Sequence, residues 1–225
     1  MKFILPAVIA FIGSGILVQA SEDLAERKYS VTLQIERSGK FLGGGLYLRL
    51  NGNCRVLTNR HNVEQASEIW VRRRAMLSSA EVESQPDAID LAVLKLNESL
   101  GEECLPLADL IPDEKRSVSG KSPWLARGYG YSSGDPTRTQ PELFSLNFLG
   151  ARFRVNETIY WRLGQTIRKG MSGSPLFVEG LPVGIITENQ TPANGSAKYG
   201  AVITNTMILR WLEKGGFIAT SELDL

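Results

Sequence analysis

The chain has 225 residues, of which 25 are Lys or Arg and 24 are Asp or Glu, so its net charge is close to zero. This balance argues against nucleic acid as a partner, because domains that bind nucleic acid usually carry a clear excess of basic residues. Hydrophobic residues make up 43% of the chain, which is enough for one compact unit with a sizeable core.

The first twenty residues have the pattern of a secretory signal peptide. Met1 and Lys2 give a positive start, residues 3–18 form an uncharged apolar run, and Ala20 provides a small residue for cleavage. The alternative is an uncleaved membrane anchor, because the run approaches the roughly 20 apolar residues that span a bilayer. We adopt cleavage, and therefore expect residues 21–225 to form an exported protein, periplasmic or secreted, that is not held by a membrane.

The rest of the chain predicts an all-β fold. Short runs rich in Val, Ile, Leu and aromatic residues are separated by Gly, Pro, Asn and Ser, with little helical periodicity. About eleven or twelve strands of this kind suit barrels or sandwiches better than alternating strands and helices. The expected strands are residues 29–35, 45–50, 54–58, 68–73, 91–96, 124–129, 143–149, 158–163, 175–177, 183–187 and 199–203.

One helix is expected near the C-terminus. Thr206 can cap it, apolar residues recur at helical spacing through 207–212, and the two glycines at 215–216 end it. Between residues 106 and 123 the sequence becomes polar, which makes this stretch the best candidate for a linker between two halves.

The chain has two cysteines, Cys54 and Cys104. Pairing is the default in an exported protein, because the compartments outside the cytoplasm are oxidising. A bridge would close a loop of about 50 residues and stabilise the fold by about 4 kcal/mol on a loop-entropy estimate. Two buried free thiols remain the alternative, since spacing alone does not show that the residues meet.

Three residues indicate acyl-transfer chemistry. His61 is the only histidine, Asp90 directly precedes the alternating run 91–96, and Ser172 lies between two glycines. A serine hydroxyl is a weak nucleophile that needs a base and a carboxylate to orient that base. The order His, Asp, Ser is one of the three in which such triads occur. Asp87 is the rival for the acidic position.

Besides a base and a carboxylate, acyl transfer needs groups that stabilise a negatively charged oxygen, and the turn around Ser172 predicts them. Gly170 permits an unusual backbone conformation that turns its N–H group inward, beside the N–H group of Ser172. Two such donors can stabilise the negative oxygen that develops on the attacked carbonyl group. We therefore expect Gly170 and Ser172 to form an oxyanion hole.

These motifs together resemble the chymotrypsin-like, or trypsin-like, serine protease family in its bacterial-type branch. Thr58-Asn59-Arg60-His61 is similar to the family's sequence around its histidine, and residues 170–175 are similar to its glycine-x-serine-glycine-x-proline signature. The resemblance covers nearly all of residues 28–214. It implies two antiparallel six-stranded β-barrels with a short C-terminal helix, one barrel over about 28–115 and the other over about 120–214.

The resemblance also implies where substrate binds. Thr166, Asn189 and Gly200 fall where the family lines its primary pocket, and Thr187 ends the strand that lies beside the substrate backbone. None of these residues is acidic, which disfavours Arg or Lys before the scissile bond, and the chain has no second histidine to favour Glu. We therefore expect a small or medium apolar side chain there.

The function implied is a serine endopeptidase that cleaves polypeptides through an acyl-enzyme on Ser172, with His61 as general base and Asp90 as orienter. We expect a monomer without a metal or cofactor. The alternative is a catalytically silent relative that binds peptides or partner proteins through the same cleft.

Overall fold

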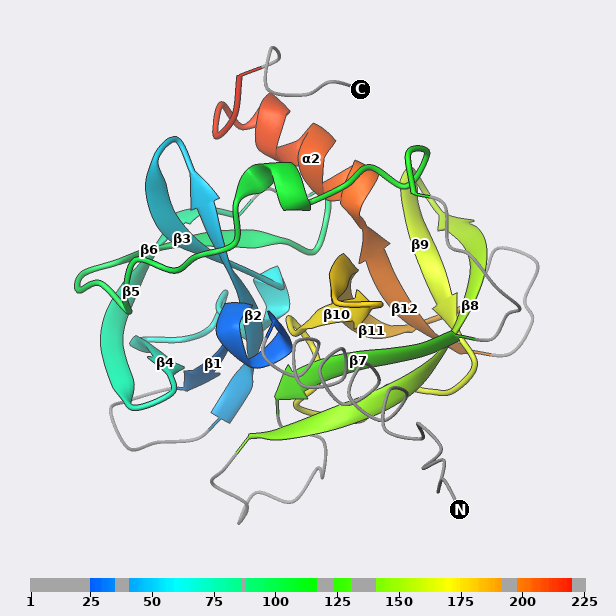
Figure 1. The fold of residues 1–225 in the computed structure, drawn as a ribbon, viewed down its shortest axis with the longest axis horizontal. Coiled ribbons are helices and arrows are strands. Elements are labelled where there is room, and N and C mark those ends of the chain that lie inside the picture. The colour runs from blue at the N-terminus through cyan, green and yellow to red at the C-terminus, as the bar shows by residue number, and fades with distance from the viewer. Residues whose placement is uncertain are drawn as a thin grey trace, which may run out of the picture.

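The structure is a computed structural model that describes residues 25–34, 41–85, 88–116, 124–130, 141–191 and 198–219. Its strands close into two six-stranded barrels, in the order β1-β2-β3-β6-β5-β4 and β10-β11-β12-β9-β8-β7. Neighbouring strands in both barrels are antiparallel. Figure 1 shows the barrels side by side, the first in blue to green and the second in green to orange. The predicted fold of two antiparallel six-stranded barrels and a C-terminal helix is confirmed.

The first barrel consists of β1 (Ser30–Gln34), β2 (Phe41–Leu50), β3 (Asn53–Thr58), β4 (Ile69–Arg73), β5 (Met76–Ser84) and β6 (Ala92–Leu96). The second consists of β7 (Trp124–Gly130), β8 (Glu142–Val155), β9 (Thr158–Leu163), β10 (Pro175–Val178), β11 (Leu181–Gln190) and β12 (Tyr199–Thr204). Residues 25–29 are helical. The other helical elements are the 3-10 turns η1 (Arg60–Asn62) and η2 (Leu107–Asp109) and the helix α2 (Asn205–Lys214).

β5 is not among the strands predicted from the sequence, and β2 is longer than predicted. β5 reads Met-Leu-Ser-Ser-Ala-Glu-Val-Glu-Ser, with too few apolar residues to signal a strand, yet it pairs with β4 on one side and β6 on the other. β2 begins at Phe41, ahead of the predicted start at 45, because the glycines at 43–45 pair with β1. The polar run of β5 therefore forms a strand because it has partner strands on both sides, and the glycine run of β2 does so because it pairs with β1.

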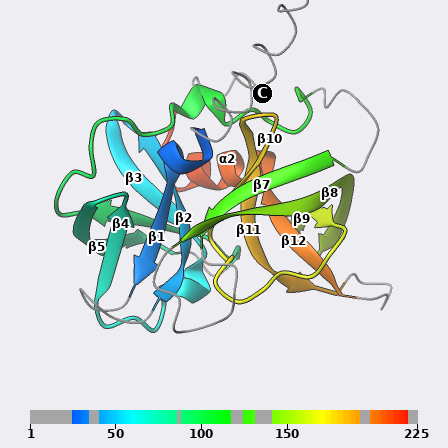
Figure 2. The same cartoon turned by 60° about the horizontal axis from the view of Figure 1, so that its bottom comes forward.

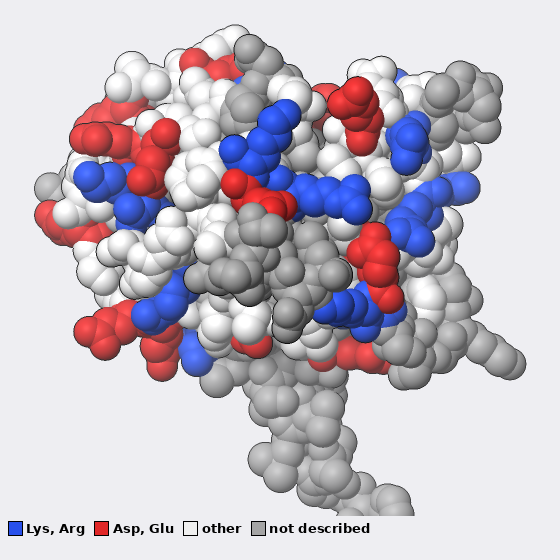
Figure 3. All heavy atoms as spheres, turned by 90° about the horizontal axis from the view of Figure 1, so that it is seen from above, with Lys and Arg blue, Asp and Glu red and all other residues white. Residues whose placement is uncertain are grey.

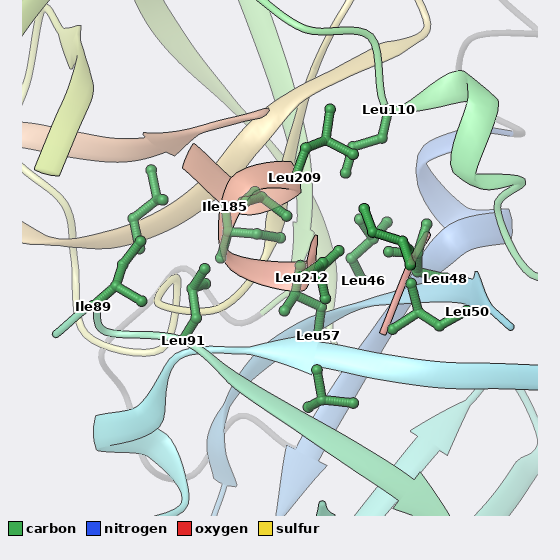
Figure 4. Close-up of a cluster of buried hydrophobic side chains, with 14 of the residues drawn as sticks. Leu46, Leu48, Leu50, Leu57, Ile89, Leu91, Leu110, Ile185, Leu209 and Leu212 are labelled. Carbon is green, nitrogen blue, oxygen red and sulfur yellow. The ribbon is translucent and has the colours of Figure 1, made fainter. Parts of the chain in front are cut away.

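The largest hydrophobic cluster lies between the barrels. Strand β2 contributes to two clusters. Leu46 and Leu48 belong to the cluster between the barrels, whereas Tyr47 points into the first barrel. Side chains alternate between the two faces of a strand, and here both faces are buried. Figure 4 shows the cluster, which combines residues of the first barrel, the second barrel and α2, among them Leu57, Leu91, Ile185, Leu209 and Leu212.

Helix α2 lies at the junction of the barrels, as Figures 1 and 2 show from two directions. Its N-cap is Thr204, which has an extended backbone conformation and whose hydroxyl oxygen accepts from the N–H group of Met207 at 3.3 Å. The prediction that Thr206 caps the helix is therefore wrong, because Thr206 already lies in the first turn. Its hydroxyl instead accepts from the N–H group of Asp113 at 2.9 Å and donates to Glu114 at 2.7 Å. Thr206 thereby holds the middle of the connection between β6 and β7.

The disulfide between Cys54 and Cys104 is present, which confirms the predicted pairing. It joins the start of β3 to the segment that follows β6. Residues 1–20, the predicted signal peptide, lie outside the described residues, and none of the helices that are described is long and apolar enough to cross a membrane. On the face seen in Figure 3, basic and acidic side chains are interspersed, as the near-zero net charge leads one to expect.

Candidate active site

His61 and Asp90 meet because β3 and β6 are antiparallel neighbours. Thr58 at the end of β3 lies opposite Ala92 at the start of β6. His61 follows β3 in η1 and Asp90 precedes β6, so both reach the same end of the first barrel. His61 Nδ1 lies 2.7 Å from Asp90 Oδ2, and the backbone N–H group of His61 donates to Asp90 Oδ1 at 3.1 Å. The carboxylate thus holds the imidazole ring through one oxygen and its backbone through the other.

Asp90 is anchored by two further residues. Asn59 is fully buried and donates from Nδ2 to the carbonyl oxygen of Asp90 at 2.9 Å. Thr187, from the second barrel, donates its hydroxyl to Asp90 Oδ2 at 2.7 Å. A carboxylate that accepts several hydrogen bonds is stabilised in its charged form. Asp87, the rival for this position, lies outside the described residues.

The path of β11 brings Thr187 to Asp90. Ile185 packs in the cluster between the barrels, and by strand alternation Thr187 faces the same side. The register then shifts, since Ile186 pairs with Val202 while Asn189 pairs with Gly200. One extra residue on β11 is a β-bulge, which changes the direction of the side chains that follow it.

Ser172 lies in a turn whose backbone conformation favours glycine at positions 170 and 173. Gly170 and Gly173 have φ angles of 95° and 83°, in the left-handed region that glycine adopts without steric cost. A Cβ atom at Gly173 would collide with the carbonyl oxygen of Gly44 and lie 2.5 Å from Thr58 Oγ1. The two glycines on either side of Ser172 are therefore required by backbone conformation, and the second also by space.

The Ser172 hydroxyl contacts Thr187. Ser172 Oγ donates to the carbonyl oxygen of Thr187 at 3.1 Å. Within the described part of the chain, no hydrogen bond joins Ser172 Oγ to His61. Because the hydroxyl of Thr187 is bonded to Asp90, this one residue contacts both the carboxylate and the serine. The structure thus brings the three predicted residues to one place, with the serine not yet bonded to the imidazole.

Two backbone N–H groups beside Ser172 are unpaired. In the described ranges, neither the N–H group of Gly170 nor that of Ser172 donates to another group. The N–H groups of Met171, Gly173 and Ser174, by contrast, all donate within the protein. The turn therefore leaves unpaired the two donors that the sequence analysis assigned to an oxyanion hole.

The two barrels are in direct contact beside this turn. The carbonyl oxygen of Ser172 accepts from the N–H group of Gly44 at 2.8 Å and from Asn62 Nδ2 at 3.1 Å. A Cβ atom at Gly43 would lie 2.6 Å from the same oxygen, so glycine is needed there. Since Asn62 follows His61, the turn that carries the imidazole is bonded directly to the turn that carries the serine.

The predicted pocket residues lie on the segment before Ser172 and on the strands after Thr187. Thr166 is exposed in the segment between β9 and Ser172. Asn189 and Gly200 are paired across β11 and β12. Thr187, predicted to bind substrate, is almost fully buried with its side chain against Asp90.

Comparison with known proteins identifies the family. The profile of the family described as trypsin-like peptidase domain matches residues 38–185, which is more than half of the chain. The chain belongs to this family. No curated protein sequence matches it significantly.

Solved structures share the fold of this trypsin-like domain at low sequence identity. The MamO protease domain from Magnetospirillum magneticum is 20% identical, with a TM-score of 0.61, and the match covers 84% of this chain and 97% of that one. The active form of the Rv3671c protease from M. tuberculosis is 19% identical, with a TM-score of 0.62 and coverage of 97% and 94%. The HtrA-type protease AlgW, solved with a decapeptide, is 18% identical, with a TM-score of 0.66 and coverage of 87% and 66%.

The surroundings of the trypsin-like site move two pKa values in opposite directions. Burial, the largest influence on His61, lowers its pKa, but the hydrogen bond and charge of Asp90 and the charges of Glu188 and Glu64 outweigh it, so the pKa lies above 6.5. Burial raises the pKa of Asp90, but the bonds from His61 and Thr187 outweigh it, so that pKa lies below 3.8. At neutral pH Asp90 is therefore ionised.

The sequence analysis missed the parts played by Asn59, Asn62 and the Thr187 hydroxyl. Asn59 and Asn62 both lie within two residues of His61, and buried amides must find hydrogen-bond partners. That rule could have marked them as members of the site. Thr187 carried no such signal, because its meeting with Asp90 depends on how the two barrels dock.

Proposed function

We propose that the chain is an exported serine endopeptidase that cleaves polypeptides through an acyl-enzyme on Ser172. The observation that carries the proposal is the chain of hydrogen bonds from His61 to Asp90, from Asp90 to Thr187 and from Thr187 to Ser172. An imidazole, a carboxylate and a serine hydroxyl gathered in this way are the groups that acyl transfer needs. Membership of the trypsin-like peptidase family supports the same reaction.

In the proposed reaction, Ser172 Oγ attacks the scissile carbonyl carbon while His61 Nε2 takes the hydroxyl proton. Asp90 stabilises the imidazolium, and the N–H groups of Gly170 and Ser172 stabilise the negative oxygen. The C–N bond then breaks as His61 returns the proton to the leaving amine, and water cleaves the resulting ester with help from the same base. For the first step, the Ser172 hydroxyl must reorient so that it donates to the imidazole instead of the Thr187 carbonyl.

The free edge of β11 supports an extended peptide as substrate. β10 pairs with β11 only up to Ile185, whereas residues 188–190 have β12 as their sole partner strand among the described residues. An extended chain can add to such an edge through main-chain hydrogen bonds. This edge begins beside the Thr187 carbonyl that Ser172 contacts, so a peptide bound to it would run past the serine.

A fluorophosphonate that labels activated serines tests the proposal. We expect stoichiometric labelling of the wild type and none of Ser172→Ala, with kcat on a peptide substrate falling by roughly a million-fold, as in other triads. Ser174→Ala is the matched control, because Ser174 lies in the same turn and its buried hydroxyl has no partner in the described structure. It should label normally. A wild-type protein that is folded but unlabelled contradicts the proposal.

A catalytically silent peptide-binding protein is the second candidate. One observation favours it, namely that the Ser172 hydroxyl donates to Thr187 and not to the imidazole. If the serine cannot leave this partner, the site would bind peptides at the edge of β11 without cleaving them. The same labelling experiment separates the two functions, because a silent protein stays unlabelled while still binding an extended peptide.

Export and a monomeric state are part of the proposal. The pattern of residues 1–20 supports export, and so does the disulfide, because disulfides persist in oxidising compartments. Expression of the whole chain in a bacterium should give a protein outside the cytoplasm whose sequence begins at Ser21, and light scattering should give the mass of one chain. Full-length protein in the membrane fraction would support the anchor instead.

A further inference from the structure

Two segments diverge from the contact between Ser172 and Thr187. One segment runs backward from Ser172 to residue 164, and the other runs forward from Thr187 along β11. A peptide on the free edge of β11, with its carbonyl oxygen at the unpaired N–H groups of Gly170 and Ser172, has its carbonyl carbon at Ser172 Oγ. We call the space between the two segments the slot, and on this placement the side chain of that residue would enter it.

The slot is bridged by a single side chain. Asn189 Oδ1 accepts from the N–H group of Ile167 at 2.7 Å, and Asn189 Nδ2 donates to the carbonyl oxygen of the same residue at 3.1 Å. The bridge lies only two residues beyond Thr187 on one segment and five before Ser172 on the other. The two segments are thus joined at both ends, by Ser172 with Thr187 and by Ile167 with Asn189.

The floor beyond the bridge is filled as well. The N–H group of Gly200 donates to the carbonyl oxygen of Gln165 at 3.2 Å. A Cβ atom at Gly200 would lie 2.5 Å from that oxygen and 3.0 Å from Ile167 Cγ1. The segment before Ser172 is therefore packed directly onto β12, with Ile167 over Gly200.

The bulge in β11 is what places the amide there. Because of the bulge, Asn189 on β11 pairs with Gly200 on β12, and both lie on the face of the sheet that contacts Ile167. A primary amide has a donor and an acceptor side by side, which matches the N–H and C=O groups of one residue. A carboxylate of the same size has no donor for the carbonyl oxygen, and an alanine reaches neither group.

From this geometry we propose that Asn189 determines specificity by closing the slot, so that only small side chains, of the size of alanine or valine, fit before the scissile bond. The inference rests on the proposed peptidase function and narrows its substrate class. It is sharper than the sequence-based expectation of a small or medium apolar side chain, because Leu and Phe would have to displace the bridge.

Four peptide substrates that differ only in the residue before the cleaved bond, Ala, Val, Leu or Phe, test the inference. For the wild type we expect kcat/KM to be about a hundredfold higher for Ala than for Phe, in the range that pocket size controls. Asn189→Ala should reduce that ratio at least tenfold, chiefly by raising kcat/KM for Leu and Phe. Asn189→Asp, which keeps the acceptor but loses the donor, should fall between the two.

Leu181→Ala is the control, since Leu181 lies on the same strand, β11, at the end away from Thr187, and its side chain is exposed. It should keep the wild-type order of substrates. Equal rates for Ala and Phe in the wild type, or an unchanged ratio in Asn189→Ala, would overturn the inference and leave the peptidase function standing. A wild type that is folded but cleaves none of the four would overturn the peptidase function, and the inference with it.

Discussion

Replacing Thr187 by valine tests whether the second barrel helps to hold the carboxylate of the first. Valine has nearly the shape of threonine but lacks the hydroxyl that donates to Asp90 Oδ2 at 2.7 Å. Thr187 is almost fully buried, so no water molecule replaces the lost donor without rearrangement. The backbone carbonyl that accepts from Ser172 is unchanged in this variant.

The size of the effect follows from the kind of bond. A hydrogen bond to a charged group contributes about 1.5–3 kcal/mol, which corresponds to a factor of roughly 10 to 150. Asp90 retains both of its bonds to His61, so we expect the lower end, a fall of about tenfold in kcat/KM with little change in KM. Thr187→Ser is the matched control, because it keeps the hydroxyl and loses only the methyl group.

The pH dependence of stability provides a second test of the hydrogen bond from Thr187 to Asp90. The Thr187 hydroxyl helps to hold the pKa of Asp90 below 3.8, so its contribution to the free energy of unfolding is present above that pH and is lost as pH falls through the folded-state pKa. The difference in stability between wild type and Thr187→Val should therefore shrink in acid. If the serine variant is as impaired as the valine variant, packing of the methyl group matters and our reasoning about the hydroxyl is wrong.

Three further predictions concern other parts of the site and fold. Glu188→Gln removes a charge that raises the pKa of His61, so the acid limb of the kcat/KM profile should move to lower pH, and an unmoved limb would contradict this. Replacing both cysteines by serine should lower the free energy of unfolding by about 4 kcal/mol in a denaturant titration, whereas a loss below about 1 kcal/mol would argue against the loop-entropy account. Gly173→Ala should destroy activity, because the new Cβ atom would collide with the backbone of Gly44 in addition to the strain of a positive φ. Gly52→Ala is the control, since Gly52 has a similar φ but no atom within 4 Å of the added Cβ atom. It should lower the free energy of unfolding by only about 1–2 kcal/mol in thermal or chemical unfolding.

The sequence predicted those features that depend on residues close together in the chain. His61, Asp90 and Ser172 each lie in a short recognisable motif, and apolar runs bounded by turn residues marked eleven of the twelve strands in the described ranges. β5 escaped because its partners, and not its own apolar residues, make it a strand. The Thr187 hydroxyl and the Asn189 bridge escaped because each depends on a meeting of distant segments, which no local pattern records.

The division of the site between the barrels has a consequence for the newly made protein. The imidazole and carboxylate belong to the half that is synthesised first, whereas the serine and both unpaired N–H groups belong to the half that follows. In the proposed mechanism, a growing chain therefore holds an incomplete set of reactive groups until its last strands have folded and docked. If the chain is the proposed peptidase, this arrangement delays its activity until synthesis is complete and so limits self-digestion of the nascent molecule.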